Sequence, residues 1–314
     1  MSSDSAPPAT SFPPAPPAFY IAGPTGVGKS EFAVEVAEQV DGEIVGADAF
    51  QLYAGLPILT AQPAAELRAR VPHHLVAEIP LSEGFDVAEY VRRAGDLIRG
   101  IRARGRLPIV VGGTGLYIRS LVHGLADLPK ADSKLRAELE ALPLEELNQR
   151  IEKLDPDAAR TIDRKNPRRV VRALEVCLLT GQPFSSFRKQ WEEPTANAVG
   201  VVLLRQKEEL RRRIDARVRQ MFSEGVVEEV ATAGKLSETA SQVLGYAEIQ
   251  QLVRGEITKE ACIAAIQTQT RQYAKRQMTW FARETWMRAL ELSSAPAPHV
   301  AEVVEAASRF ANRA

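Results

Sequence analysis

The stretch Gly23-Pro24-Thr25-Gly26-Val27-Gly28-Lys29-Ser30 decides the fold of this 314-residue chain. It matches the pattern G-x-x-x-x-G-K-S/T of a phosphate-binding P-loop. The apolar run 19–22 before it predicts a buried strand, and the segment 30–40 after it predicts a helix. In such a loop the glycines let backbone N–H groups converge on phosphate oxygens, Lys29 reaches the terminal phosphates and Ser30 ligates Mg²⁺. We therefore expect a polyphosphate site here and not merely a structural glycine turn.

Strand and helix patterns alternate beyond the loop. A second strand, 43–47, ends at Asp48; a helix spans 87–104 and leads into a third strand, 107–111. This alternation predicts a parallel sheet covered by helices. The expected fold class is α/β, a P-loop NTPase-like parallel sheet core with a helical insertion domain.

The insertion follows from a change in pattern along the chain. From 126 to 198 we expect helices and turns only, and 199–204 then predicts a strand that returns to the sheet. After Lys207 the pattern is helical to about Leu290. The predicted organisation comprises a flexible Pro-rich tail 1–18, a catalytic core 19–125 and 199–292, a helical insertion 126–198, and a C-terminal segment 293–314 with a short helix at 299–312.

Composition limits the class of protein. Apolar residues make up 45% of the chain, charged residues make up 25%, and the formal net charge is zero. A nucleic-acid partner would therefore have to be held by local basic patches. Two cysteines, Cys177 and Cys262, are too few for a disulfide framework and favour a reducing cytoplasm. No apolar run reaches the roughly 18 residues of a membrane span, and we expect no signal peptide at the N-terminus.

Two polar residues follow predicted strands at the edge where open α/β sheets bind ligands. Asp48 ends the second strand, and Thr114 lies in a glycine turn, Gly112-Gly113-Thr114-Gly115, after the third. Both are candidates to contact the phosphate site. From the residues alone, Asp48 could equally cap a helix or help hold Mg²⁺, and Thr114 could be an ordinary turn residue.

Basic residues gather in three places, as phosphate-contacting patches do. Solvated helix faces with intrahelical ion pairs are the alternative, above all for the second group. The groups are Arg164, Lys165, Arg168, Arg169 and Arg172; then Arg205, Lys207, Arg211, Arg212, Arg213, Arg217 and Arg219; then Arg271, Lys275, Arg276 and Arg283. The aromatics Tyr246, Trp280 and Phe281 could stack on an unstacked base, although aromatics at this spacing are more often core residues.

The order and spacing of several further segments resemble the bacterial tRNA dimethylallyltransferases from about Ala22 to Trp286. The segments are GPTGVGKS (23–30), GADAFQLYAGLPILTAQP (46–63), PHHL (72–75), VVGGTGLYI (110–118), NPRRVVRALEV (166–176), TGQPFS (180–185), LGYAEI (244–249) and QTRQYAKRQMTWF (269–281). The resemblance implies that the P-loop binds the diphosphate of dimethylallyl diphosphate, without nucleotide hydrolysis. It makes Asp48 the general base, Thr114 its partner at the adenine, and Arg217 a diphosphate contact.

The resemblance also implies tRNA contacts in four segments. The candidates are Asp48, Ala49, Phe50 and Gln51; Arg168, Arg169, Val170, Val171 and Arg172; Gln242, Gly245 and Tyr246; and Lys275, Arg276, Gln277 and Trp280. Three positions that bear on RNA contact depart from the family pattern: Ala49 replaces a serine, Gln62 a lysine, and Ala247 a basic residue. Ser30 replaces threonine in the P-loop but keeps the hydroxyl.

The expected reaction is attack of adenine N6 on the allylic carbon as diphosphate leaves, with Asp48 taking the proton. The expected partners are dimethylallyl diphosphate, Mg²⁺ and tRNA, modified at the adenine 3′ of the anticodon, with the enzyme a monomer. The alternatives are a nucleotide kinase or other P-loop NTPase, a nucleotide-dependent RNA-binding switch, and a prenyltransferase acting on free AMP.

Overall fold

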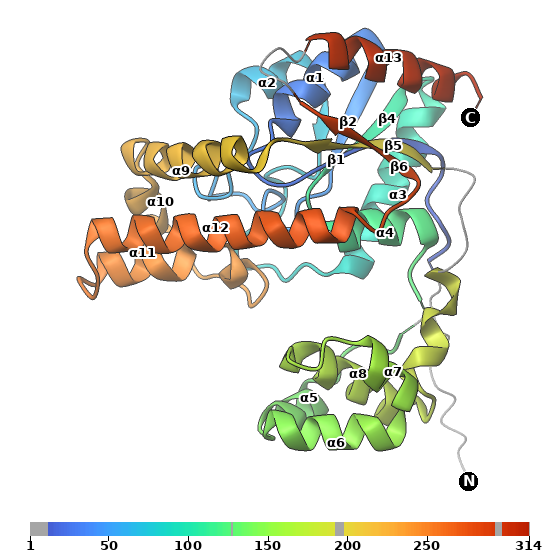
Figure 1. The fold of residues 1–314 in the computed structure, drawn as a ribbon, viewed down its shortest axis with the longest axis vertical. Coiled ribbons are helices and arrows are strands. Elements are labelled where there is room, and N and C mark those ends of the chain that lie inside the picture. The colour runs from blue at the N-terminus through green and yellow to red at the C-terminus, as the bar shows by residue number, and fades with distance from the viewer. Residues whose placement is uncertain (1–11, 127, 192–197, 293–296, 314) are drawn as a thin grey trace. The chain divides into compact units, whose positions relative to one another are not determined.

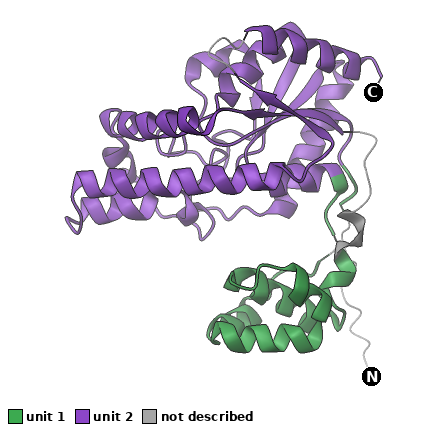
Figure 2. Cartoon of the chain, viewed as in Figure 1, with its two compact units in different colours: residues 1–14, 123–194 green, residues 15–122, 195–314 purple. Residues whose placement is uncertain are grey.

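The computed structural model describes residues 12–126, 128–191, 198–292 and 297–313. Two compact units are present: one comprises Met1–Pro14 with His123–Pro194, the other Ala15–Val122 with Thr195–Ala314 (Figure 2). No helix within the described ranges is long and apolar enough to cross a bilayer.

The larger unit is built on a six-stranded sheet in which every neighbouring pair is parallel, in the order β3-β2-β4-β1-β5-β6 (Figure 1). The strands are β1 Ala18–Ala22, β2 Gly42–Gly46, β3 His73–His74, β4 Leu107–Gly112, β5 Ala198–Leu204 and β6 Met287–Glu291. The predicted parallel sheet is confirmed, and β1 lies at its centre with β4 on one side and β5 on the other. The carboxyl ends of β2, β4 and β1 therefore lie side by side.

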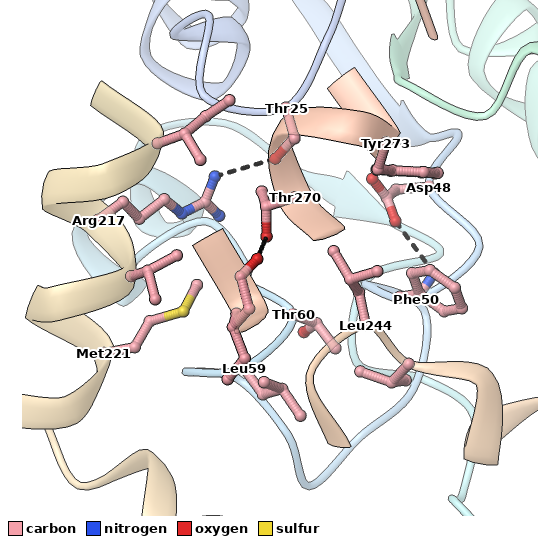
Figure 3. Close-up of a pocket in the computed structure, with 14 residues that line it drawn as sticks. Thr25, Asp48, Phe50, Leu59, Thr60, Arg217, Met221, Leu244, Thr270 and Tyr273 are labelled. Carbon is pink, nitrogen blue, oxygen red and sulfur yellow. Dashed lines mark hydrogen bonds between the residues drawn. The ribbon is translucent and has the colours of Figure 1, made fainter. Parts of the chain in front are cut away.

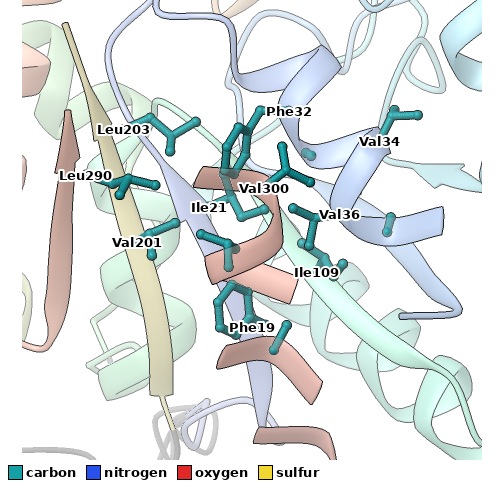
Figure 4. Packing of buried hydrophobic residues seen from close by; sticks show 14 of the residues in the cluster. Phe19, Ile21, Phe32, Val34, Val36, Ile109, Val201, Leu203, Leu290 and Val300 are labelled. Atoms are coloured by element: carbon teal, nitrogen blue, oxygen red, sulfur yellow. The ribbon is translucent and has the colours of Figure 1, made fainter. Parts of the chain in front are cut away.

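Helices cover both faces of this sheet. The helices α1 (Lys29–Gln39) and α13 (Ala297–Ala311) cover one face, and α3 (Val87–Ala103) and α4 (Gly115–His123) lie on the other (Figure 1). Asp86 fixes the start of α3, because its side chain accepts a hydrogen bond from the Glu89 N–H. The core beneath α1 and α13 includes apolar side chains from five strands and these two helices, among them Phe19, Ile21, Phe32, Ile109, Val201, Leu203, Leu290 and Val300 (Figure 4).

A layer of helices beside the sheet completes the larger unit. It contains α9 Lys207–Ser223, α10 Val226–Thr232, η2 Ala240–Gln242, α11 Tyr246–Val253 and α12 Lys259–Phe281, whereas α2 Ala65–Arg70 packs beside α1. A second apolar cluster joins α9, α10, α11 and α12 to the loop that holds Leu56 and Leu59. This cluster forms one wall of the pocket described below.

The smaller unit is helical, as predicted for the insertion. Its elements are α5 Ser133–Glu140, α6 Leu144–Leu154, α7 Pro156–Thr161, α8 Pro167–Thr180 and η1 Phe184–Trp191. Asn166 caps α8 by accepting from the Arg169 N–H, Pro167 occupies its first turn, and Gly181 ends it at φ 65°. Cys177 is buried in this unit and Cys262 in the larger one, as core residues.

Two expectations about the ends of the core are wrong. Helix does not continue to about Leu290, because α12 ends at Phe281 and β6 pairs with β5. Ordered contacts also begin before residue 19: Phe12 forms an antiparallel bridge with Leu125, and the Ala15 N–H donates to the Leu121 carbonyl. Their backbone groups find partners in the chain, so this part of the predicted tail is ordered; its residues 1–11 lie outside the described residues.

Candidate active site

The P-loop connects β1 to α1 and has the conformation that its glycines permit. Gly28 precedes the helix at φ 102°, in the left-handed region that L side chains rarely adopt. Lys29, the first residue of α1, donates from Nζ to the carbonyls of Gly23 and Pro24, both at 2.9 Å. The loop therefore folds around the ammonium group of Lys29, and the N-terminus of α1 points into the space that the loop encloses. This arrangement suits an anion.

Burial within the loop changes the pKa of the Lys29 ammonium group. Burial lowers its pKa to about 8; the Asp48 carboxylate opposes that shift and the Arg217 guanidinium adds to it. Lys29, Asp48 and Arg217 line one cleft, although Asp48 and Arg217 come from separate segments of the chain.

We expect the affinity of this site for inorganic pyrophosphate to fall as pH rises above about 8. The pKa of Lys29 is about 8 in the free protein, so the ammonium form dominates below that pH and is lost above it. A bound polyanion stabilises the ammonium and raises its pKa, so affinity falls by up to about tenfold per pH unit above about 8. Calorimetric titration measures this.

Lys29→Arg is the control for that titration, because a guanidinium stays charged throughout the range. The ratio of wild-type to Lys29→Arg affinity cancels the ionisation of pyrophosphate itself. A constant ratio from about pH 7 to about pH 9.5 would contradict the assignment of the titration to Lys29.

Three arginines surround the P-loop. Arg217 on α9 donates to Thr25 Oγ1 at 3.3 Å and to the Ala61 carbonyl at 3.3 Å. Arg213, one helical turn earlier, donates to the Gly26 carbonyl at 2.9 Å, and Arg205 donates to the Val27 carbonyl at 2.8 Å. Burial lowers the pKa of Arg217, with Asp48 opposing the shift. The second group of basic residues is thus divided: Arg205, Arg213 and Arg217 donate to the loop, Arg213 from an exposed position, and Lys207, Arg211, Arg212 and Arg219 are exposed.

Asp48 lies just beyond β2 with its two carboxylate oxygens in different roles. Its Oδ1 accepts from the N–H of Phe50 at 3.0 Å and of Gln51 at 3.4 Å. Within the described part of the chain no group donates to Oδ2. Asp48 therefore caps a turn and not a helix, which was one interpretation of the sequence, and this leaves a second oxygen for a ligand.

Thr114 organises the same turn from β4. Its Oγ1 accepts from the Ala49 N–H at 3.0 Å, and its own N–H donates to the Ala47 carbonyl at 3.0 Å. The residues on either side of Asp48 are thus both bonded to Thr114. The structure brings Asp48, Thr114, Arg217 and the P-loop together at the carboxyl edge of the sheet, as the sequence predicts.

An apolar pocket opens beside these polar groups (Figure 3). Its polar residues include Thr25, Asp48, Arg217 and Tyr273. Its apolar walls are Leu59, Ile214, Val218, Met221, Val243, Leu244 and Ile266. A wider cleft lined by Lys29, Ser30, Arg213 and Arg217 adjoins it and shares Thr25, Asp48 and Thr60 with it. The arrangement fits an amphiphilic ligand that has a polyanionic head and a short apolar chain.

Hydrogen bonds of three side chains, which the sequence does not indicate, hold the pocket's loop. The Glu229 carboxylate accepts from the N–H groups of Ile58 and Leu59 at 2.7 and 2.8 Å. Gln62 donates to the carbonyls of Gln51 and Tyr53, and Gln51 donates to the carbonyl of Ala61 at 2.7 Å. Gln62 is one of the departures from the family pattern, and in this structure its side chain holds the backbone at Gln51 and Tyr53 in place.

The tRNA candidates of the larger unit differ in exposure. Lys275, Arg276, Gln242 and Ala247 are exposed. Tyr246 is buried and its hydroxyl accepts from Gln250, while Phe281 is in the core. Gly245 has φ 88°, and a Cβ at this position would lie 3.2 Å from Ile266 Cδ1. Ala49 and Phe50 are half-buried beside Asp48. Gln277 and Trp280 face inward toward the second glycine turn.

The candidates on α8 also fall into two groups. Arg168 and Arg169 are exposed, whereas Val170 and Val171 are buried in the core of the smaller unit. Arg172 donates to Glu175 at 2.5 Å and to the Pro129 carbonyl at 2.7 Å. The helix thus presents two cations to solvent and uses the third internally.

Comparison with known proteins shows the family that this chain resembles. The model of the family described as IPP transferase matches residues 51–284. The tRNA dimethylallyltransferase of Akkermansia muciniphila is 45% identical over 279 residues, covering 89% of this chain and 95% of that protein. The tRNA dimethylallyltransferase 1 of Citrifermentans bemidjiense is 42% identical, with coverage of 91% and 95%.

Solved structures show the same likeness. The full-length tRNA isopentenylpyrophosphate transferase of Bacillus halodurans superposes with a TM-score of 0.68 at 34% identity, covering 95% of this chain and 97% of that one. A eukaryotic dimethylallyltransferase, solved acting on tRNA, superposes with a TM-score of 0.75 at 29% identity, covering 88% and 74% of the two chains.

Proposed function

The chain belongs to the IPP transferase family, and from this premise we propose that it transfers a dimethylallyl group from dimethylallyl diphosphate to N6 of an adenine in tRNA. By resemblance the target is the adenine 3′ of the anticodon. The observation that carries the proposal is the apolar pocket that meets the P-loop, Arg217 and Asp48 at one end. A short prenyl chain joined to a diphosphate matches this pairing of apolar walls and anion-binding groups.

The reaction assigns one role to each part of the site. N6 forms a bond to the allylic carbon while the bond from that carbon to the diphosphate oxygen breaks. The P-loop N–H groups, Lys29 and Arg217 stabilise the negative charge that develops on the leaving diphosphate. Asp48 accepts the proton that N6 loses, through the carboxylate oxygen that caps no backbone N–H. Thr114 keeps the Asp48 turn in place by accepting from the Ala49 N–H.

The residues present fit a magnesium ion. Ser30 and Asp48 line the same cleft as Lys29, and Mg²⁺ is commonly held by one or two protein oxygens together with substrate phosphates. Within the described ranges no three His, Cys, Asp or Glu side chains gather as a metal site, so the diphosphate would supply the remaining ligands. We propose that Ser30 holds Mg²⁺ in this way, where it would neutralise charge on the diphosphate.

The adenine has to leave its stack to reach Asp48, at a cost of a few kcal/mol. The basic residues exposed on α8 and α12, Arg168, Arg169, Lys275 and Arg276, are the proposed contacts with the tRNA backbone. We further propose that the enzyme acts as a cytoplasmic monomer.

The test is incubation with labelled dimethylallyl diphosphate, Mg²⁺ and unmodified tRNA, followed by nucleoside analysis. The expected product is an N6-prenylated adenosine, formed without phosphate release from ATP or GTP. Steady nucleotide hydrolysis with no prenylated nucleoside would overturn the proposal, and efficient transfer to free AMP would redirect it to a small-molecule acceptor.

Replacing Arg168 and Arg169 together with alanine is expected to weaken tRNA binding and flatten its salt dependence. Each RNA phosphate that the protein no longer neutralises reduces the slope of log K against log salt by about 0.9 on a duplex, or about 0.7 on a single strand. Both side chains are exposed, so the melting temperature should change little. Filter binding across a salt series measures the slope.

Arg172→Ala is the contrasting variant on the same helix. It removes a partner of Glu175, a fully buried carboxylate that also accepts from Arg136 and from the Asp132 N–H. We expect a loss of about 1–3 kcal/mol in stability with the salt slope retained. If the salt slope of the double Arg168/Arg169 variant is unchanged, α8 does not contact the RNA.

A further inference from the structure

Gln277 connects the two loops on which the proposed reaction depends. It lies in the last third of α12 with 5% of its surface exposed. Its Oε1 accepts from the Thr25 N–H at 2.9 Å, and its Nε2 donates to the Gly113 carbonyl at 2.9 Å. Thr25 belongs to the P-loop and Gly113 to the second glycine turn, so one amide bridges two segments far apart in the sequence.

We propose that Gln277 is a positioning residue that sets the distance between the diphosphate site and the proton acceptor; this inference rests on the proposed function. At the diphosphate site, Thr25 Oγ1 accepts a hydrogen bond from Arg217. Near the proton acceptor, Gly113 precedes Thr114, whose hydroxyl holds the turn that carries Asp48. The β1–β4 pairing ends at Ala22 and Gly112, and the Gln277 amide continues the connection beyond it.

A neutral amide suits this place for a chemical reason. A backbone N–H can only donate and a backbone carbonyl can only accept, so the bridge needs an acceptor and a donor on one side chain. This requirement also fixes which end of the amide faces which loop. A carboxylate would meet the Gly113 carbonyl with negative charge, and an apolar side chain would leave both backbone groups unpaired in a buried setting.

Residues on the same face of α12 as Gln277 also pack against the second glycine turn. A side chain at Gly115 would overlap Trp280, because its Cβ would lie 2.1 Å from Trp280 Cδ1. Tyr273, one turn before Gln277, lies close enough to interact with the side chains of Thr114 and Gln277. The spacing 273, 277, 280 places all three on one helical face. Gln277 is thus used inside the protein, unlike the exposed Lys275 and Arg276 beside it.

The first test replaces Gln277 with methionine, which keeps the length of the side chain and removes both hydrogen bonds. A displacement of about 1 Å at the reacting groups costs up to about 10²-fold in rate, so we expect kcat to fall by about 10- to 100-fold. Affinities for dimethylallyl diphosphate and for tRNA should stay within about threefold, because both polar atoms of the Gln277 amide are bonded to backbone groups of this chain. Gln272→Met, at an exposed position of the same helix, is the matched control and should behave as wild type.

The second test uses Gln277→Glu and its pH dependence. A protonated carboxyl group has a donor and an acceptor and can restore the bridge, whereas the carboxylate cannot. Burial next to a carbonyl raises the pKa of such a glutamate, by several units in fully buried cases. The ratio of the kcat of Gln277→Glu to that of wild type should therefore rise as pH is lowered from about 8.5 to about 6. A merely structural role would not make this ratio pH-dependent.

A third measurement does not depend on activity. Loss of the bridge frees the Thr25 N–H, so its hydrogen exchange should accelerate in Gln277→Met and not in Gln272→Met. Wild-type protein that fails to prenylate tRNA would defeat the proposed function while leaving this exchange test intact. Normal kcat in Gln277→Met, a pH-independent ratio for Gln277→Glu, or unchanged exchange at Thr25 would each overturn the positioning role.

Discussion

Replacing Lys29 with alanine is expected to slow prenyl transfer by at least about 10²–10³-fold while the affinity for tRNA stays within about twofold. Lys29 is enclosed by the P-loop and bonded to the carbonyls of Gly23 and Pro24. Its charge is therefore available to a diphosphate in the cleft and not to a polymer on the surface. Loss of this charge removes stabilisation of the leaving diphosphate, which matters most in the transition state.

Transfer under single-turnover conditions and filter binding of tRNA separate the two effects. Lys235→Ala, at an exposed lysine of the same unit, controls for the loss of one positive charge. A parallel fall in tRNA affinity would contradict the division of labour between the P-loop and the basic surfaces. Full activity in Lys29→Ala would remove the P-loop lysine from the reaction.

The sheet and its catalytic edge could be predicted because their signals are local. Apolar runs of four to six residues marked β1, β2, β4 and β5, and polar residues directly after them marked the edge. Since neighbouring parallel strands end at one edge, Asp48 and Thr114 were expected beside the P-loop. The glycine pattern 23–30 identified the loop because its backbone conformation requires those glycines.

The edge strands could not be predicted for the opposite reason. The sequence Met287-Arg-Ala-Leu-Glu291 is rich in helix-forming residues, and its buried positions, Met287 and Leu290, are three apart. Pairing with β5 makes it a strand, which is a tertiary effect that overrides local propensity. β3 has only two residues, His73 and His74, too few for any periodic pattern.

The supporting contacts of the site could not be predicted, because the partners are distant in sequence. Gln277 is separated by 252 positions from Thr25, and Glu229 by 171 from Ile58. A glutamine beside Lys275 and Arg276 has the sequence context of a basic, RNA-facing helix. Only the packing of α12 against the glycine turn reveals that its amide points inward.

Asp48→Asn is expected to lower kcat by about 10²–10⁴-fold, the usual cost of losing a general base. The substitution is close to isosteric and keeps the Oδ1 acceptor that caps the N–H groups of Phe50 and Gln51. The turn should therefore persist, and the change is confined to the oxygen that faces the ligand space. Affinity for dimethylallyl diphosphate should change little, since Lys29, Arg217 and the P-loop remain.

A magnesium-holding role for Asp48 predicts a different response from the same variant. Ser30 and Asp48 line one cleft, so loss of a carboxylate ligand would weaken Mg²⁺ binding, and donor affinity would fall with it. Raising the Mg²⁺ concentration would then restore the rate. The missing ligand lowers the fraction of sites that hold Mg²⁺, but it does not change the rate of transfer at a site where Mg²⁺ is bound. A missing base cannot be replaced by metal, so the rate of a proton-acceptor variant stays low at every Mg²⁺ concentration. Single-turnover transfer by Asp48→Asn across a Mg²⁺ titration distinguishes the two: a low plateau assigns Asp48 to the proton, and recovery to the wild-type rate assigns it to the metal.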